Sequence, residues 1–479
     1  MKKISLCVAL TGICSVFLCS AYANPAAADS SNIKYKAHLK GQYTYNENND
    51  LDTLDAKSQR SENIEFKASV YGDINEDFSF LTEARAVKNY GDGGSIDSDT
   101  GEAAGRDDFV ELRQYWLEYS GLSQFVPLSL RAGRQRIRES RSLWWNRDLD
   151  AVSLIYDATL FSGFLSVGEN LTEYRSSSDV FNRDDENLLR VLGQTSWQWK
   201  QNNFLEARFA FQDDHSGIES VGAQVPSDDE DDEDSDLFWF GARATGEIEF
   251  PQSKPIETIS YRADIIGLTG SQDNELSTAN GNGKSTVTGS SEEDVSAWAI
   301  DAGLDITLPV GNKPVITLGY AFGSGDDDST DGDNNEFRQT GLDGNTSKML
   351  GSNSSYYNYG SVLRPDLANI HIITAGVGMP IMKNSHVGFK YHYYMLDEDA
   401  TSLATSGLTA SLNGTDKDLG HGVDLAVNVD VSEELNITHK GFDRIDLKTT
   451  LGAFHSGDAY GTAEGETALR GQIDLRFRF

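Results

Sequence analysis

The chain has 479 residues, 75 of them acidic and 40 basic, which gives a formal net charge of −35. This acidity argues against nucleic-acid binding, which requires a basic surface. Only 38% of the residues are hydrophobic, and no segment beyond the N-terminus approaches the roughly eighteen consecutive apolar residues of a transmembrane helix.

The N-terminus predicts a secretory signal peptide over residues 1–23. A short basic start is followed by an apolar stretch and by Ala21-Tyr22-Ala23, a cleavage site of the small-x-small type. We therefore expect a single mature domain over residues 24–479. All three cysteines precede the cleavage site, so the mature domain can form neither a disulfide nor a thiolate metal site.

From residue 33 onward, apolar and polar residues alternate. Ile33, Tyr35 and Leu39 alternate with Lys34 and Lys36, and a period of two indicates a strand with one apolar face. The same pattern recurs along the chain, whereas helical periodicity is nowhere comparable. We predict eighteen strands, with sixteen as the alternative count, at residues 33–45, 63–72, 78–88, 108–119, 127–138, 148–157, 162–172, 187–199, 204–214, 237–249, 258–270, 295–308, 314–323, 368–379, 385–396, 421–430, 441–455 and 467–479.

The last of these segments, 467–479, has Leu469 and Ile473 on one face, Arg470 and Asp474 on the other, and ends on Phe479. Many outer-membrane barrels end on such an aromatic residue, and this end resembles theirs. An even number of strands, joined alternately by short turns and long loops, lets a barrel close with both termini in the periplasm. The predicted fold is an all-β, transmembrane, antiparallel up-and-down β-barrel of the Gram-negative outer membrane, and a soluble sandwich is the alternative.

Long polar loops are predicted at 89–107, 215–236, 271–294, 324–367 and 396–420. Acidic residues concentrate in two of them, at 228–234 and 326–333. The order of the possible ligands does not match a calcium-binding loop. Solvated surface loops are therefore the favoured interpretation of both runs.

Basic residues concentrate on the faces that we predict to point inward. In the segment 130–138, Arg134, Arg136 and Arg138 share one face at a spacing of roughly 6.8 Å, and Arg131 lies on the other. A guanidinium is always charged and matches a carboxylate bidentately, so such a lumen would attract carboxylate-bearing solutes, even though part of these charges would pair with one another. The other predicted inward charges are Lys34, Lys36, Lys40, Arg85, Arg113, Arg190, Arg208, Lys448, Arg470, Glu111, Glu206, Asp264, Asp301 and Asp474.

The segment 133–139, followed by Trp144-Trp145-Asn146, resembles the signature of the outer-membrane alginate export family. Residues 337–342, 363–367 and 457–461 support this resemblance, which covers essentially the whole mature chain. It implies a monomeric eighteen-stranded barrel that passes the polyuronate alginate through a narrow electropositive pore. The lining that it implies consists of the cations Lys34, Arg85, Arg138, Arg364, Lys448 and Arg470, with Glu139 and Asp474 as acidic residues among them.

In that family an extracellular loop and a long periplasmic turn gate the pore. The loop 89–107 is a candidate here, but the turn 431–440 is short for this role.

The predicted function is a passive outer-membrane conduit for an anionic polysaccharide, alginate in the first place. The expected partners are this polymer, outer-membrane lipid and periplasmic polymer-secretion proteins; no nucleic acid, cofactor or metal is expected. The alternative is a substrate-specific porin that imports small acidic sugars or organic acids. An enzyme is a third class, and we expect none, because the chain has no Gly-x-Ser-x-Gly nucleophile motif.

Overall fold

The structure is a computed structural model that describes residues 32–479 except 53–55, 92–94, 97–102, 106, 123–126, 173, 178–186, 227–232, 252–254, 281–282, 329, 349–353 and 438–440. The predicted signal peptide and most of the candidate gating loop 89–107 lie outside these residues. Within the described part, no helix is long and apolar enough to span a bilayer.

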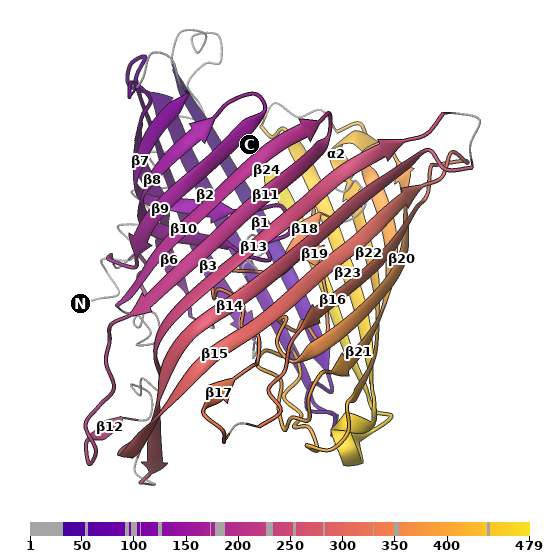
Figure 1. Ribbon diagram of the computed structural model, residues 1–479. Coiled ribbons are helices and arrows are strands. Elements are labelled where there is room, and N and C mark those ends of the chain that lie inside the picture. Colours follow the sequence, from indigo (N-terminus) through magenta and orange to yellow (C-terminus); the bar gives the residue numbers. More distant parts are fainter. Residues whose placement is uncertain are drawn as a thin grey trace.

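Eighteen long strands form a closed antiparallel barrel (Figure 1). Each strand pairs with the next along the chain, and the first pairs with the last, where Tyr43 lies opposite Ile473. The long strands are β1 (Ile33–Glu47), β2 (Ser58–Asp73), β3 (Phe78–Gly91), β6 (Phe109–Tyr119), β7 (Leu128–Arg138), β8 (Asn146–Asp157), β9 (Phe161–Glu169), β10 (Leu188–Lys200), β11 (Asn203–Asp214), β13 (Glu233–Glu249), β14 (Thr258–Ala279), β15 (Lys284–Thr307), β16 (Val315–Gly323), β20 (Ile370–Met382), β21 (Ser385–Leu396), β22 (Asp418–Asp430), β23 (Arg444–Ser456) and β24 (Thr467–Arg478).

Several short elements belong to the connections. They are β4 (Ser95–Ile96), β5 (Ala103–Gly105), β12 (Gln224–Pro226), β17 (Asp333–Asn334), β18 (Thr346–Lys348), β19 (Ser355–Tyr357), the helix α2 (Val431–Glu434) and the 3-10 helix η3 (Asp458–Ala463). β1 begins and β24 ends at the same end of the barrel, which is uppermost in Figure 1. We call it the terminal end, and the opposite end the loop end.

The predicted barrel and its count of eighteen strands are confirmed, with most strand boundaries within a few residues. The long loop predicted at 271–294 is wrong. There β14 and β15 continue as one paired ribbon beyond the other strands, with a bulge between Leu276 and Ser277. This extension has polar residues on both faces, whereas apolar alternation marks only where a strand meets lipid.

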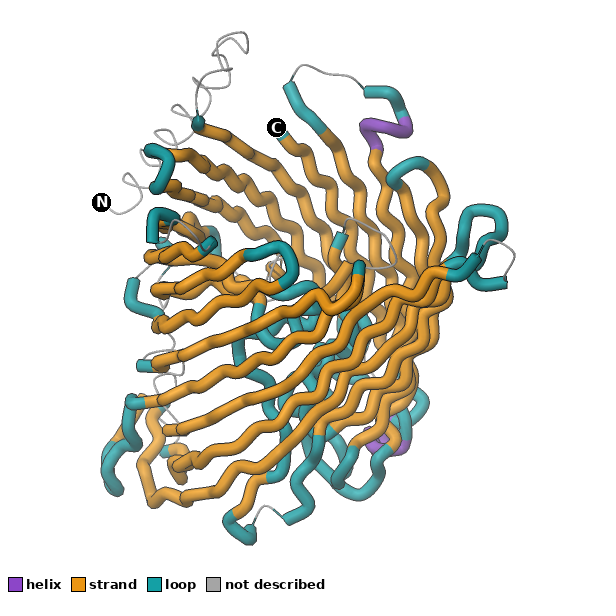
Figure 2. Tube along the Cα trace, turned by 45° about the horizontal axis from the view of Figure 1, so that its top comes forward, coloured by secondary structure: helices purple, strands orange, loops and turns teal. Residues whose placement is uncertain are grey.

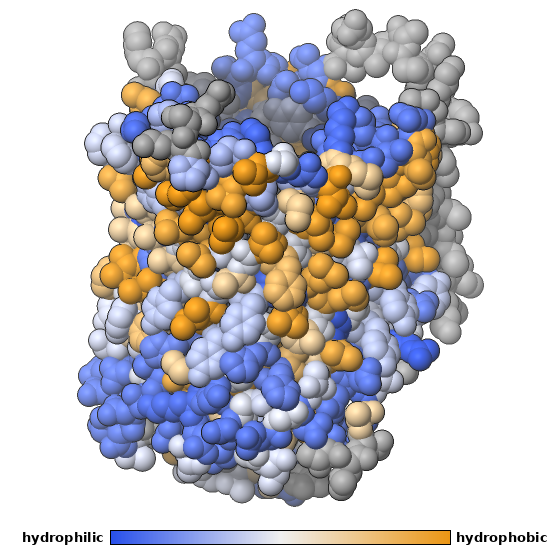
Figure 3. Space-filling view, turned by 90° about the vertical axis from the view of Figure 1, so that its right-hand side faces the viewer, coloured by the Kyte–Doolittle hydropathy of each residue, from blue (hydrophilic) through white to orange (hydrophobic). Residues whose placement is uncertain are grey.

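Large apolar side chains form a belt around the outside of the barrel, among them Val152, Leu165, Phe240, Trp298 and Leu304, all exposed. The belt is visible in Figure 3, with strongly hydrophilic surface beyond it toward the loop end. Exposed apolar surface of this extent is costly in water. It is the expected outer face of a transmembrane barrel, since lipid then covers it.

Several connections at the loop end fold back into the barrel, and Figure 2 shows loop segments inside the ring of strands. They carry an apolar core of their own, in which Leu143, Trp144, Trp145, Leu363 and Leu367 are almost fully buried. The lumen is therefore narrowed by packed loops rather than left as an open tube.

Candidate functional site: the lumen of the barrel

The inner face of the wall is polar and charged. On β1 the buried residues Lys40, Gln42 and Thr44 alternate with Leu39 and Tyr43, which are exposed on the lipid side. The side-chain period of two places one set of residues inside the barrel and the other outside. What matters for function is how many of the inner charges lack an opposite charge.

Most of the charges on the wall from β1 to β8 neutralise one another. Lys40 lies opposite Glu65 in the β1–β2 register and its Nζ is 3.3 Å from the Glu65 carboxylate. Arg85 contacts Glu65 at 3.4 Å and Glu111 at 2.7 Å. The ladder then continues through Arg113, which is 3.4 Å from Glu111 and 2.8 Å from Asp148. The predicted lining residue Arg85 is therefore present in the wall but compensated by two carboxylates.

Arg134 and Arg136 lie where the pairing between β6 and β7 ends. β6 and β7 pair only between Tyr115–Tyr119 and Leu130–Arg134. Where that pairing ends, Gly133 has a φ of +121°, and a Cβ there would lie 2.2 Å from the carbonyl oxygen of Tyr115. Only glycine fits this bend.

Beyond the bend, both arginines have acidic partners. Arg134 is 3.5 Å from Asp150 and its guanidinium lies over the ring of Tyr174. Arg136 is 3.7 Å from Asp148 and donates to Asn146 at 2.7 Å. The ladder of three arginines expected on β7 is thus reduced to Arg138 as its exposed member.

Arg138 borders a cavity of about 300 Å³ along the inner face of β7–β10, together with Gln135, Ser153 and Gln194. Arg131 borders the same cavity, and it is 2.6 Å from Glu118. The β7–β8 pairing runs from Leu128 to Arg138 without a register shift, so Arg131 and Arg138 lie on alternate faces of the strand, as expected from the sequence.

Glu139 anchors the turn that follows β7. Its carboxylate accepts hydrogen bonds from the backbone N–H groups of Arg141 at 2.9 Å, Leu143 at 2.5 Å and Trp144 at 3.3 Å. Across the barrel it accepts from Arg243 at 2.5 Å, and Arg208 is 3.8 Å away. Glu139 thus holds an inward loop against β11 and β13.

Two arginines that the resemblance implied, Arg364 and Arg470, form no close ion pair in the part of the chain that the structure describes. Arg470 donates to Asn46 at 2.8 Å and to Gln472 at 3.3 Å, and the Arg364 guanidinium lies 5.6 Å from the ring centre of Tyr357. Neither has a carboxylate at ion-pair distance among the described residues. The Arg364 guanidinium repels that of Arg470, while Asp474 and Asp424 attract it from beyond ion-pair distance; an anion between the two guanidiniums would relieve the repulsion.

The other predicted residues lie in different parts of the barrel. Lys448 is 3.9 Å from Asp474 and 4.7 Å from the ring centre of Tyr356. Asp474 accepts from Gln42 at 2.9 Å. Arg190 is buried under the inward loop, where a Cβ at Gly341 would lie 3.9 Å from its guanidinium. Lys34 is exposed at the start of β1, at the terminal end.

Lys390 on β21 (Ser385–Leu396) was not among the predicted lining residues. It is half-buried, and no carboxylate lies at ion-pair distance from it in the residues that the structure describes. The segment 385–396 carried an alternating signal that would have placed Lys390 inside, between Phe389 and Tyr391 on the lipid side.

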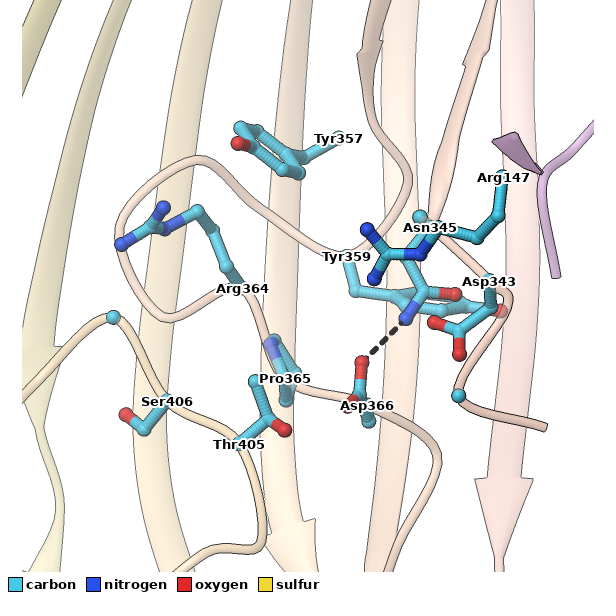
Figure 4. Close-up of a pocket in the computed structure, with 13 residues that line it drawn as sticks. Arg147, Asp343, Asn345, Tyr357, Tyr359, Arg364, Pro365, Asp366, Thr405 and Ser406 are labelled. Carbon is cyan, nitrogen blue, oxygen red and sulfur yellow. Dashed lines mark hydrogen bonds between the residues drawn. The ribbon is translucent and has the colours of Figure 1, made fainter. Parts of the chain in front are cut away.

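A cavity of about 390 Å³ lies inside the barrel beside Arg364 (Figure 4). Arg364 and Tyr357 stand on one side of it and Arg147 on the other, with Asp343, Asn345 and Asp366 between them. Both aspartates belong to the connection from β16 to β20, outside the membrane-spanning strands. Burial raises the pKa of each carboxyl, and Asp366 raises that of Asp343 further.

The backbone around Arg364 is held in an unusual conformation. Its φ is +48°, which is uncommon for a residue other than glycine. The N–H of Gly407 donates to the carbonyl of Leu363 at 2.6 Å, and a Cβ on Gly407 would lie 2.9 Å from the Nε of Arg364. The close approach of two inward loops therefore fixes where this guanidinium points.

Comparison with known proteins gives two kinds of match. A family model described as alginate export matches residues 32–473. The alginate production protein AlgE of Pseudomonas aeruginosa is 29% identical over 377 residues, which cover 78% of this chain and 75% of that protein. AlgE of Pseudomonas syringae pv. tomato is 24% identical over 409 residues, covering 81% of this chain and 80% of that one.

Among solved structures, the outer-membrane protein OprD of Pseudomonas aeruginosa has a TM-score of 0.53 at 11% identity, covering 95% of each chain. OccK2 (OpdF) of the same organism has a TM-score of 0.54 at 9% identity, covering 93% of this chain and 98% of that one. At such low identity these structures support the fold alone.

Proposed function

This chain belongs to the alginate export family, and from that premise we propose how its lumen conducts the polymer. The chain is an outer-membrane β-barrel channel for alginate. Our proposal is that alginate threads past Arg364, Arg470, Lys390 and Arg138, which have no carboxylate at ion-pair distance within the described residues.

The observation that carries this proposal is the contrast between paired and unpaired cations. An arginine that is paired with carboxylates, such as Arg85, contributes little to the electrostatic potential in the lumen. A guanidinium without such a partner attracts each passing carboxylate. Every residue of a polyuronate carries one carboxylate. Several cations along the path would let the polymer pass from one site to the next, and conduction requires binding that favours entry and still permits exit.

Several further features belong to the proposal. We propose that residues 1–23 are removed on export and that 24–479 form one monomeric barrel in lipid, with its terminal end in the periplasm. Periplasmic polymer-secretion proteins would deliver the chain there. We also propose that the barrel catalyses no reaction and selects for anions.

Single-channel recording in a planar bilayer tests this function. We expect a small anion-selective current that polyuronate interrupts, while neutral dextran of equal length at the same concentration leaves it unchanged. Block by both polymers alike would show that size and not charge decides entry, and would contradict the proposal. A detergent-free protein that stays soluble and never inserts would contradict the barrel in lipid.

A further inference from the structure

The wall of the barrel is built differently between β6 and β7 than elsewhere around them. These two strands pair only between Tyr115–Tyr119 and Leu130–Arg134, whereas β7 and β8 stay paired as far as Arg138 and Asn146. Over the loop-end half of β6, the next strand of the barrel therefore does not complete the wall. A wall in lipid is normally held by backbone hydrogen bonds from strand to strand, because an unsatisfied backbone group is costly there.

A piece of the connection from β9 to β10 fills this gap. We call its residues 171–172 and 174–176 the strap. The N–H of Leu112 on β6 donates to the carbonyl of Tyr174 at 2.8 Å, and the N–H of Ser176 donates to the carbonyl of Val110 at 2.9 Å. The strap thus pairs with the edge of β6 and takes the place of a strand in the wall.

Side chains hold the strap against β7 and β8, above all the carboxylate of Asp150. It accepts hydrogen bonds from the N–H groups of Leu171 and Thr172, both at 3.1 Å, and from the Thr172 hydroxyl at 2.9 Å. Arg134 lies 3.5 Å from Asp150, and its guanidinium is 3.5 Å from the ring centre of Tyr174. One carboxylate therefore joins β7, β8 and the strap.

The lumen reaches this part of the wall from the inside. Arg136 and Arg138 border the cavity of about 300 Å³, and Arg136 is 3.7 Å from Asp148. Asp148 in turn is 2.8 Å from Arg113 on β6. A layer of ion-paired side chains and the strap therefore lie between the cavity and the outside of the barrel.

We propose that the strap closes a lateral exit: the wall opens between β6 and β7 when Asp150 releases the strap, and the polymer leaves the lumen sideways at the loop end. The inference rests on the proposed function and adds to it the route of the polymer. The route along the barrel axis meets the apolar core of the inward loops, in which Leu363 and Leu367 are almost fully buried. Releasing the strap exposes polar groups that water can bind at the edge of the bilayer, so it costs less than parting two paired strands in lipid.

The test is a disulfide that fixes the strap to β6, which is feasible because residues 24–479 contain no cysteine. Val110→Cys with Ser176→Cys joins two residues that share a backbone hydrogen bond, and paired residues of this kind have Cα atoms about 5.5 Å apart, as a disulfide requires. We expect the oxidised variant to release labelled alginate from liposomes at least about tenfold more slowly than the same variant after reduction with dithiothreitol. The single-channel conductance for small anions should be the same in both states.

Thr269→Cys with Ser296→Cys is the matched control. The two residues are exposed and lie opposite each other on β14 and β15, whose pairing continues on both sides of them. Oxidation of this control should leave alginate release unchanged. Equal release from the oxidised and the reduced Val110→Cys/Ser176→Cys barrel would overturn the lateral exit and leave the conduit intact. If the unmodified barrel releases no alginate at all, the proposed function itself fails.

Asp150→Asn tests the hold on the strap without a new covalent bond. The variant keeps the size of the side chain but loses the charge that faces Arg134. We expect the strap to be released more often, and trypsin therefore to cleave after Arg175 several-fold faster in folded barrels, with the cut identified by mass spectrometry. Asp77→Asn, which changes an exposed acid at the terminal end, should not alter this rate. Equal cleavage rates in the two variants would show that Asp150 does not hold the strap closed.

Discussion

Replacing Arg364 and Arg470 together with glutamate is expected to change the channel from anion-selective to cation-preferring and to abolish block by polyuronate. Neither guanidinium has a carboxylate at ion-pair distance among the described residues. A carboxylate about 4 Å from one guanidinium gains roughly 4 kcal/mol at the effective dielectric near a protein surface. Reversing the charge at both positions turns this attraction into repulsion, which acts within a Debye length of about 8 Å. The reversal potential in a salt gradient measures the change.

The matched control reverses two charges that lie on the surface. Lys57 is 3.0 Å from Asp50 and Lys313 is 2.7 Å from Glu257, and both lysines are largely exposed. Lys57→Glu with Lys313→Glu makes the same change in net charge and should leave selectivity almost unchanged. Equal effects of the two pairs would mean that overall charge, and not the lumen, sets selectivity.

Glu139→Ala is expected to release the inward turn after β7 and to destabilise the loops that narrow the lumen. Removing this carboxylate leaves three backbone N–H groups without their acceptor, and it leaves Arg243 with Asp264 but without its second carboxylate. The loss of one partner from a buried ion pair costs about 3–5 kcal/mol. We expect larger and noisier single-channel currents, and faster proteolysis of the loops in folded barrels.

Glu233→Ala provides the comparison for Glu139→Ala. Glu233 is 2.6 Å from Arg338, and both side chains are partly exposed at the loop end. Exposed ion pairs contribute roughly 0–1 kcal/mol, so this variant should keep the normal conductance. If the single-channel currents of Glu139→Ala are no larger and no noisier than those of Glu233→Ala, the turn is held by its apolar contacts and not by the carboxylate.

The strands could be predicted because the bilayer imposes their pattern. Lipid requires an apolar outer face, so alternation marked nearly every strand, including the first, with Leu39 and Tyr43 outside. Where lipid ends, the pattern ends too. The polar extension of β14 and β15 therefore could not be recognised from apolar alternation.

The site was predictable only in part, because the electrostatic field in the lumen depends on which charged side chains of neighbouring strands form ion pairs. Alternation places Lys40 and Arg85 inside, but whether they act on a solute depends on the strand register that brings Glu65 and Glu111 to them. Asp343 was missed for a different reason. It belongs to a connection that looks like a surface loop in sequence and folds into the barrel through contacts distant in the chain.

The loops also explain what the family motifs do. Phe337 and Leu363 are buried in the core inside the barrel, and Gln339 links the two motifs through Leu367. These motifs therefore build the packed loops that narrow the lumen. Arg364 and Asp366, in the second motif, line its cavity.

The central claim is that alginate crosses the membrane through this lumen and is guided by its uncompensated arginines. The most direct measurement is the release of fluorescently labelled alginate from liposomes that contain the purified barrel. We expect release with the unmodified protein, and release at least about tenfold slower with Arg364→Glu and Arg470→Glu together, the effect of roughly 1.4 kcal/mol on the barrier. Release at the same rate from both, or none from either while small anions still pass, would contradict the account.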